Sequence, residues 1–317
     1  MATNPHTGVH QTTNAPMDGK GGCSRRDFLK LSGLTTLAVG GTALLSACGP
    51  AAQGTTDGMD GTSSGSDTGT LGDGKTMRVG MEAAYAPYNW QTAESTDYTI
   101  PIENVDGAYA DGYDVQLAKT VADALGMEPV AVKMSFTGLI DALNNGQIDI
   151  IMAGMSATDE RKQAVDFSEP YFVGGFGLLV KSDSPYASAT SLSDFSGAAV
   201  LGQKDTLLDT VIDDIPGVNH LTPVDSVPSQ LSQLNQGTCD AITYDVENEK
   251  GLIAANPDLV AVEVGGSKVL FKEDAPINAG IAKGHDETLA KINEVIRSVT
   301  QEQRQAEWDA VQGRLPE

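Results

Sequence analysis

The sequence predicts an α/β protein made of two similar lobes with a cleft between them. The chain has 317 residues, enough for two compact units that each bury a core. It contains 35 glycines against 7 phenylalanines and 2 tryptophans, a composition typical of α/β proteins with many tight turns. A helix, turn and strand pattern also occurs twice, at 142–151 and at 233–242. Because the two copies are far apart, they indicate two lobes rather than a solenoid.

Each copy of this repeat predicts a ligand-facing segment. Both copies read as a helix end, a glycine cap, a turn and a strand, and the second strand continues to Tyr244 and Asp245. In open parallel sheets, ligands bind beyond the carboxyl ends of the strands. Residues 154–156 of the first lobe and 244–245 of the second are therefore expected to face one cleft.

The N-terminal segment has the pattern of an export signal. A twin-arginine sequence, Ser24-Arg25-Arg26-Asp27-Phe28-Leu29-Lys30, precedes a weakly apolar run that is too rich in glycine and threonine to favour a membrane span. The run ends in Leu45-Ser46-Ala47-Cys48, which resembles the lipobox of bacterial lipoproteins. We expect residues 1–47 to be a twin-arginine lipoprotein signal peptide and Cys48 to carry the lipid; the alternative is an uncleaved anchor helix.

Residues 48–75 are predicted to form a disordered tether that begins at the lipidated cysteine. They are mostly Gly, Ser, Thr and Asp, with almost nothing to bury. Residues 69–76 formally match the P-loop pattern, but that motif needs a strand before it and a helix after it. Here a low-complexity segment comes first and a strand at 77–81 follows, so we do not expect a nucleotide site.

The first lobe continues with a loop that is dense in aromatic residues. Tyr85, Tyr88 and Trp90 lie in it, and either core packing or stacking on a ligand would explain them. Apolar residues at helical spacing then predict a helix over 113–125 that Gly126 ends. A strand at 129–134 and a short helix at 139–145 complete this part.

The stretch 148–161 reads as a buried strand, an exposed turn and the first turn of a helix. Gly154 allows a ligand to approach the backbone, and Thr158 or Ser156 can cap the helix, with Asp159 and Glu160 in its first turn. Arg161 is unfavourable near a helix N-terminus unless an anion meets it. It is therefore either a solvated arginine paired with a neighbouring acid or a clamp for a ligand carboxylate.

Two extended segments connect the predicted lobes. Residues 171–180 form a glycine-punctuated crossover that suits a hinge, and 277–282 read as the return crossover. Helices within 286–312, anchored by Trp308, are expected to pack back on the first lobe. The predicted boundaries are 76–172 and 278–317 for lobe 1 and 173–277 for lobe 2.

Composition excludes several classes of function. The formal net charge of −23 disfavours nucleic-acid binding, because no basic stripe exists to neutralise phosphates. Of the 3 cysteines, only Cys239 lies in the folded part, where we interpret it as a core residue rather than a nucleophile. The 4 histidines show no metal-ligand spacing, so neither a zinc site, a histidine-based hydrolase nor a cofactor is expected.

At this point the chain resembles the polar amino-acid-binding proteins of ABC importers, extracellular solute-binding family 3. The resemblance covers residues 76–312 and rests on these motifs: Tyr85-Ala86-Pro87-Tyr88, Gly112-Tyr113-Asp114, Phe136, Asp149, Gly154, Thr158-Asp159-Glu160-Arg161, Asp166-Phe167-Ser168 and the segment from Asp240 to Asp245. It implies a type II periplasmic-binding fold with a hinge of two crossover segments. It also implies delivery of one amino acid to a membrane permease, by a protein of the cell envelope that is anchored on the outer face of the cytoplasmic membrane or is periplasmic.

The same resemblance implies how the amino acid is held. The α-carboxylate would bind Arg161 and Ser156, completed by backbone amides near Thr206 and Leu207. The α-ammonium would bind Asp245 and the Gly154 carbonyl. Tyr85 and Phe136 would sandwich the side chain, with Glu82 at its far end. Physical chemistry agrees, because a buried zwitterion needs a fixed cation and a fixed anion.

One departure from the family bears on the ligand. Asp205 stands where the family usually has glycine, and near a carboxylate it would repel. If Asp205 faces the cleft, it makes three acids with Glu82 and Asp245 against Arg161. This favours a cationic ligand, such as lysine, arginine or ornithine, with glutamine or another neutral polar amino acid as the alternative. A dehydratase-like enzyme using Glu82 as general acid, or a ligand-sensing lipoprotein, are the alternatives of a different class.

Overall fold

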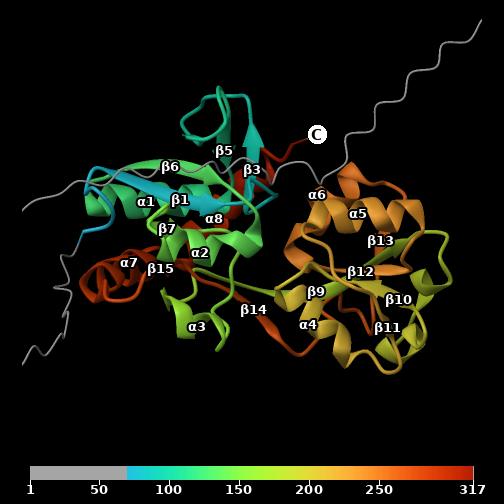
Figure 1. Cartoon of the computed structure of the whole chain (residues 1–317). Coiled ribbons are helices and arrows are strands. Elements are labelled where there is room, and N and C mark those ends of the chain that lie inside the picture. The colour runs from blue at the N-terminus through green and yellow to red at the C-terminus, as the bar shows by residue number, and fades with distance from the viewer. Residues whose placement is uncertain (1–69, 317) are drawn as a thin grey trace, which may run out of the picture. The chain divides into compact units, whose positions relative to one another are not determined.

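The computed structural model describes residues 70–316 (Figure 1). The predicted signal peptide, most of the predicted tether and the predicted lipidation site Cys48 lie outside these residues. Residues 70–75 lead directly into a strand and not into a helix, so the P-loop interpretation is excluded as expected. Within 70–316, no helix is long and apolar enough to cross a membrane.

The first large sheet contains the strand of the first repeat copy, 142–151. Strand β1 (Thr76–Met81) pairs in parallel with β6 and β7, while β15 joins antiparallel to β7 and β8. The strand order is β6-β1-β7-β15-β8. The other bounds are β6 Glu128–Lys133, β7 Ile150–Ile151, β8 Asp166–Phe167 and β15 Gly280–Ile281.

Helices cover this first sheet, and their sequences explain where they begin and end. In α1 (Tyr113–Leu125), Tyr113, Leu117 and Val121 are buried at a spacing of four, and Gly126 ends the helix in the left-handed conformation with φ 69°. The expected helix is thus confirmed. The remaining helices of this lobe are α2 Leu139–Asn144, α3 Arg161–Ala164, α7 Asp286–Ser298 and α8 Gln301–Gln312.

A small antiparallel sheet adjoins the first lobe and holds the aromatic loop. Its order is β2-β3-β5-β4, and its strands are β2 Ala84–Tyr85, β3 Asn89–Thr92, β4 Ile100–Pro101 and β5 Tyr109–Asp111. The loop joins the sheet to α1 through close backbone contact. A Cβ added at Gly112 would lie 2.1 Å from the Tyr88 carbonyl oxygen, so only glycine fits at that position.

The second large sheet repeats the arrangement of the first. Strand β10 (Ala199–Leu201) pairs in parallel with β11 and β12, and the long β9 (Phe172–Lys181) joins antiparallel to β12. The order is β11-β10-β12-β9-β13, and β14 pairs with residues 172–175 at the start of β9. The other elements of this lobe are β11 Asn219–His220, β12 Ala241–Asp245, β13 Leu259–Ala261, β14 Asp274–Ile277, α4 Leu207–Thr210, α5 Val227–Gln236 and α6 Glu249–Ala255.

Strands β9 and β14 are the two segments that run between the lobes (Figure 1). They pair antiparallel where they cross, with Phe172 opposite Ile277 and Gly175 opposite Asp274. Trp308 of α8 stacks on Phe172 at the start of β9, with ring centroids 4.6 Å apart. This tryptophan therefore packs against the first crossover. The domain boundaries predicted at 172/173 and 277/278 fall on this paired segment and stay a prediction.

The two copies of the repeat share their local geometry. Gly146 and Gly237 have φ of 67° and 72°, and in both copies the next residue donates back to a helix carbonyl five positions earlier. After each turn an aspartate binds the neighbouring strand. The Asp149 carboxylate accepts from the Arg78 amide at 2.8 Å, and the Asp240 carboxylate accepts from the Ala199 amide at 2.8 Å. The repeat is thus a structural one.

Candidate functional site

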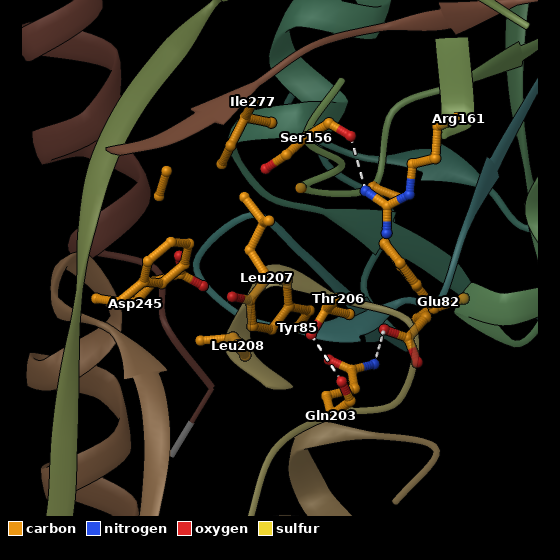
Figure 2. A pocket seen from close by; sticks show the side chains of 15 residues that line it. Glu82, Tyr85, Ser156, Arg161, Gln203, Thr206, Leu207, Leu208, Asp245 and Ile277 are labelled. Atoms are coloured by element: carbon orange, nitrogen blue, oxygen red, sulfur yellow. Dashed lines mark hydrogen bonds between the residues drawn. The ribbon is translucent and has the colours of Figure 1, made fainter. Parts of the chain in front are cut away.

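A cavity lies between the two lobes at the carboxyl ends of β7 and β12 (Figure 2). It encloses about 30 Å³ of free space. The first lobe lines it with Glu82, Tyr85, Phe136, Ala153, Gly154, Ser156 and Arg161, and the return crossover β14 adds Ala275 and Ile277. The second lobe and β9 line it with Phe176, Gln203, Thr206, Leu207, Leu208 and Asp245.

The structure therefore brings together the predicted ligand residues of both lobes, with one exception. Asp205 is exposed and lines a neighbouring groove of about 620 Å³, not the cavity. Its φ of 59° lies in the left-handed region, which explains why a glycine would suit this position. The expectation that its carboxylate makes a third acid around the ligand is not supported by this placement, because only its backbone carbonyl contacts a cavity residue.

Arg161 has no carboxylate partner among residues 70–316. Its guanidinium donates to the Ser156 carbonyl at 2.7 Å and to the Asp205 carbonyl at 2.5 Å, and lies 5.1 Å from the centre of the Phe136 ring. Burial lowers the pKa of this guanidinium to about 10. A half-buried arginine held by carbonyls and an aromatic ring, with no carboxylate at ion-pair distance within residues 70–316, has the chemistry to bind an anionic group. The solvated ion pair, the alternative interpretation, is absent within these residues.

The short helix after the turn differs in detail from its prediction. Helix α3 begins at Arg161, so Asp159 and Glu160 precede it instead of lying in its first turn. Glu160 is the N-cap residue and no side chain caps the helix, while the Arg161 amide donates to the Thr158 hydroxyl at 3.3 Å, so Thr158 holds the turn that precedes the helix. The helix is only one turn long because Val165 returns to an extended conformation before β8.

Asp245 ends β12 with its carboxyl group against the cavity. The residue is 6% exposed and forms no salt bridge within the described residues. Burial, with a smaller contribution from the nearby Glu247 charge, raises the pKa of its carboxyl group to about 8. In Figure 2, Asp245 and Arg161 lie on opposite sides of the cavity. The site thus holds an acid and a base that lack partners of opposite charge, and a zwitterion supplies both.

Glu82 and Gln203 form a contact between the lobes. The Gln203 side-chain amide donates to the Glu82 carboxylate at 3.2 Å and to the Asp225 carbonyl at 3.2 Å. Burial raises the pKa of Glu82, and the hydrogen bond from Gln203 opposes that rise. Together with the Arg161 contact to the Asp205 carbonyl, this pair joins the lobes directly.

The aromatic loop divides between the core and the cavity. Tyr88 and Trp90 are buried in the first lobe, whereas Tyr85 lines the cavity. Gly154 approaches Tyr85 so closely that an added Cβ would lie 3.0 Å from the ring. Core packing thus describes Tyr88 and Trp90, whereas stacking of Tyr85 on a ligand stays a prediction.

Thr206 and Leu207 bring the beginning of α4 to the cavity. The Thr206 hydroxyl donates to the Gln203 carbonyl at 2.7 Å and does not cap α4, so it holds the turn in place and leaves the first helical amides without a side-chain cap.

Sequence reasoning missed several cavity residues. Gln203 was not among the predicted site residues, and Phe176 was predicted only as part of the hinge segment 171–180. Gln203 could have been found, because it follows the end of β10, and strand ends are where ligands bind. Phe176, Leu208, Ala275 and Ile277 carry no such signal, because their place at the cavity depends on how the crossovers pair.

The remaining chemically reactive groups do not suggest another active centre within residues 70–316. Cys239 is buried, and burial raises the pKa of its thiol to about 11, as expected for a core residue. No group of three or more histidine, cysteine or acidic residues in this part of the chain could hold a metal ion.

Comparison with known proteins identifies relatives of the whole folded part. The model of bacterial extracellular solute-binding proteins, family 3, matches residues 77–310. A probable histidine-binding protein of Campylobacter jejuni is 33% identical over 187 residues, 59% of this chain and 66% of that protein, just under two thirds of its length. The arginine-binding extracellular protein ArtP of Bacillus subtilis is 31% identical, over 58% of this chain and 74% of that protein. Other relatives are named as cystine- and glutamine-binding proteins.

Solved structures show the same fold. An amino acid ABC transporter substrate-binding protein from Streptococcus pneumoniae, bound to L-arginine, is 26% identical with a TM-score of 0.64, covering 75% of this chain and 94% of that one. The predicted two-lobed type II fold is confirmed. Because the family model matches most of the chain, the chain belongs to the bacterial extracellular solute-binding proteins of family 3 and is a solute-binding protein rather than an enzyme.

Proposed function

We propose that this chain is the amino-acid-binding component of an ABC importer and that its ligand is a cationic amino acid, such as arginine, lysine or ornithine. The observation that carries the proposal is the charge of the cavity lining. Two acids, Glu82 and Asp245, and one base, Arg161, line it, which leaves one negative charge in excess once both carboxyl groups are ionised. An amino acid with a cationic side chain carries the complementary excess.

Each charge of such a ligand has one partner. The α-carboxylate would pair with Arg161, and the α-ammonium with Asp245. The side-chain cation would then meet Glu82, with the aliphatic part of the side chain between Tyr85 and Phe136. A buried charge is costly unless it is paired, so the three pairings support one another. A relative named for arginine binding and a similar structure bound to L-arginine support a cationic ligand, without bearing on the individual pairings.

The proposal also accounts for closure of the two lobes. Arg161 and Glu82 belong to the first lobe, while Asp245 and Gln203 belong to the second. A ligand closes two lobes only by the difference in its affinity for the closed and open forms, and contacts from both sides provide that difference. The permease would then recognise the closed, ligand-loaded protein and receive the amino acid from it.

Glutamine is the second candidate ligand, and a specific observation favours it. Glu82 already accepts a hydrogen bond from Gln203, and burial raises the pKa of its carboxyl group. Both effects reduce the need of Glu82 for a cationic partner, so a neutral amide side chain is also compatible with this end of the cavity. A glutamine-binding relative is 29% identical over 64% of this chain.

Calorimetric titration with free amino acids separates the two candidates. Arginine, lysine, ornithine, glutamine and histidine would each be titrated into wild type and into Glu82→Gln, with Glu94→Gln as the control because Glu94 is exposed. We expect the cationic ligands to bind wild type and to lose about tenfold or more in affinity in Glu82→Gln, as for the loss of a charged hydrogen bond. Submicromolar glutamine binding without arginine or lysine binding would end the cationic proposal.

We further propose that Cys48 carries a lipid that holds the protein at the outer face of the cytoplasmic membrane. The twin-arginine sequence and the lipobox-like Leu45-Ser46-Ala47-Cys48 support this. In cells, Cys48→Ala is expected to move the protein from the membrane fraction to the soluble fraction or to leave the uncleaved precursor, and a protein of mature length that stays in the membrane fraction would contradict the anchor.

A further inference from the structure

Beneath the cavity, one buried acid connects three segments of the first lobe. Asp114 lies in the first turn of α1 and is 0% exposed. Its carboxylate accepts from the Tyr171 hydroxyl at 2.6 Å and from the Asn89 amide at 2.8 Å, and the backbone N–H of Gly154 is close enough to oppose the rise in the pKa of this carboxyl group that burial causes. It forms no salt bridge within residues 70–316, so only these hydrogen bonds offset the cost of burying its charge.

Each donor belongs to a segment that the ligand site depends on. Asn89 accepts in turn from the Ala83 amide at 2.8 Å, and Ala83 lies between the cavity residues Glu82 and Tyr85. Ala83 has φ of 49°, a left-handed conformation that is strained for a residue with a side chain. The Asn89 contact therefore holds the loop in a shape it would not adopt alone.

The second donor, Gly154, is itself a cavity residue. It also adopts a positive φ, of 64°, and lies against Tyr85, two residues before Ser156. The third donor, Tyr171, directly precedes β9, the first crossover. Its own amide donates to the Ile277 carbonyl of the return crossover at 2.9 Å. One carboxylate thus touches both ligand loops of the first lobe and the point where the two crossovers meet.

We propose that Asp114 is a positioning residue that links the first-lobe ligand loops to the hinge. Asp114 does not line the cavity, so its effect on binding is indirect. It holds the Ala83 and Gly154 segments in their ligand-ready shape before binding, which spares the ligand the cost of ordering them. Through Tyr171 it also makes that shape depend on the position of the crossovers. The inference rests on the proposed amino-acid binding for its affinity readout.

The first test is independent of any ligand. Hydrogen exchange of the full chain would be followed for peptides covering 82–89 and 152–156, in wild type, Asp114→Asn and Asp123→Asn. Asp123 lies on the same helix but is exposed, so the control makes the same chemical change without these contacts. We expect both segments to exchange about tenfold or more faster in Asp114→Asn alone, the factor for one lost charged hydrogen bond. Unchanged exchange in both segments would overturn the proposal.

The second test measures coupling to the hinge. Ligand affinity would be compared in Asp114→Asn, Tyr171→Phe and the double variant. We expect Asp114→Asn to bind about tenfold more weakly, Tyr171→Phe to lose less, and the double variant to match Asp114→Asn within about twofold, because both remove one shared contact. Losses that multiply would contradict the link. If Asp114→Asn does not fold, Tyr171→Phe must by itself speed exchange of 152–156 and weaken binding, and normal values of both would refute the link.

The two tests also separate this inference from the proposed function. If wild type binds no free amino acid, the proposed function fails, whereas the exchange experiment on the ligand-free chain still decides whether Asp114 holds the two loops.

Discussion

The two lobes use one structural unit for two different tasks. In each lobe a left-handed glycine ends a helix, and an aspartate three residues later bonds to both backbone groups of one residue on the neighbouring strand. Asp149 does so with Arg78, and Asp240 with Ala199. Beyond the strand the similarity ends, because the first lobe presents Arg161 and the second presents Asp245. The fold supplies equivalent positions, and single side chains at those positions determine the chemistry.

A difference also exists within the shared unit. Arg78 places its guanidinium on Asp149, with contacts of 2.9 and 2.7 Å, whereas Ala199 has no side chain to offer Asp240. The first lobe therefore adds an ion pair to the same backbone contacts. If these differences between the lobes are local, substitutions in one lobe should leave the equivalent function of the other lobe unchanged.

The largest loss of ligand affinity is expected on substitution of Arg161, the cation of the first lobe. Arg161→Ala should weaken amino-acid binding by about 100-fold or more, because the ligand carboxylate would lose its partner while remaining buried. Arg161→Lys should recover only part of the loss, since an ammonium does not form the paired contacts of a guanidinium. Calorimetry measures both. Arg297→Ala, at an exposed arginine paired with Glu169, is the control that should bind normally.

The anion of the second lobe should show two opposite effects. Asp245→Asn should weaken binding by about 100-fold, because the ligand ammonium loses its counter-charge. The ligand-free protein should become more stable above pH 7. The folded pKa of about 8 lies above the model value of 3.8, so the wild-type carboxyl group destabilises the folded state increasingly as pH rises from about 4 to 8.

Thermal unfolding of wild type and Asp245→Asn at pH 4 and pH 8 checks the sign of this effect. The two proteins should differ least at pH 4 and most at pH 8. A variant that is no more stable than wild type at pH 8 would show that ionisation of the buried carboxyl group does not destabilise the folded protein.

The shared aspartates should differ in their contribution to stability. Asp149→Ala is expected to cost about 2–3 kcal/mol, because Arg78 is left without its carboxylate, and Asp240→Ala about 1 kcal/mol. The Arg78 side chain is 29% exposed, so water compensates part of the loss. Denaturant midpoints of the two variants provide the comparison, and equal losses would mean that the ion pair adds nothing to the first lobe.

Ligand affinity should rise with pH because of the Asp245 carboxyl group of the second lobe. An ammonium pairs with the ionised form of Asp245, so the carboxyl group must lose its proton on binding. Below its pKa of about 8, affinity should therefore increase by up to about tenfold per pH unit. Titrations at pH 6, 7 and 8 test this. The increase should shrink in Asp245→Asn, and an undiminished increase would assign it to other acids such as Glu82.

The smallest effects should be equal in the two lobes. Gly146→Ala and Gly237→Ala are each expected to cost about 1 kcal/mol, because both positions need a left-handed backbone. Nothing lies within 4 Å of an added Cβ at either site, so sterics do not distinguish them. Gly313→Ala, at φ −78°, is the control that should cost little. Unequal losses would indicate that the two caps are not equivalent.

Much of this architecture could be predicted because its signals are local. The glycine caps, the apolar strands and the helix over 113–125 depend on neighbours within a few residues. Asp245 was found because it lies at a strand end, and Arg161 because a cation near a helix N-terminus needs an anion. The contact between Glu82 and Gln203 joins residues 121 positions apart, and nothing near either one indicates the other. The same holds for Asp114 and Tyr171, which are 57 positions apart.

By itself, the sequence determined the two-lobed fold and the repeat, because these follow from periodicity, caps and strand ends, whereas most residues around the cavity were assigned through the resemblance to a known family. Only the tertiary structure decided which aromatic residues of the loop face the cavity and which are buried, that Asp205 turns away from it, and that Asp114 joins the ligand loops to the crossovers. The reason is physical. Hydrogen bonds between distant segments exist only once the lobes have packed, whereas turns and helix ends form from adjacent residues.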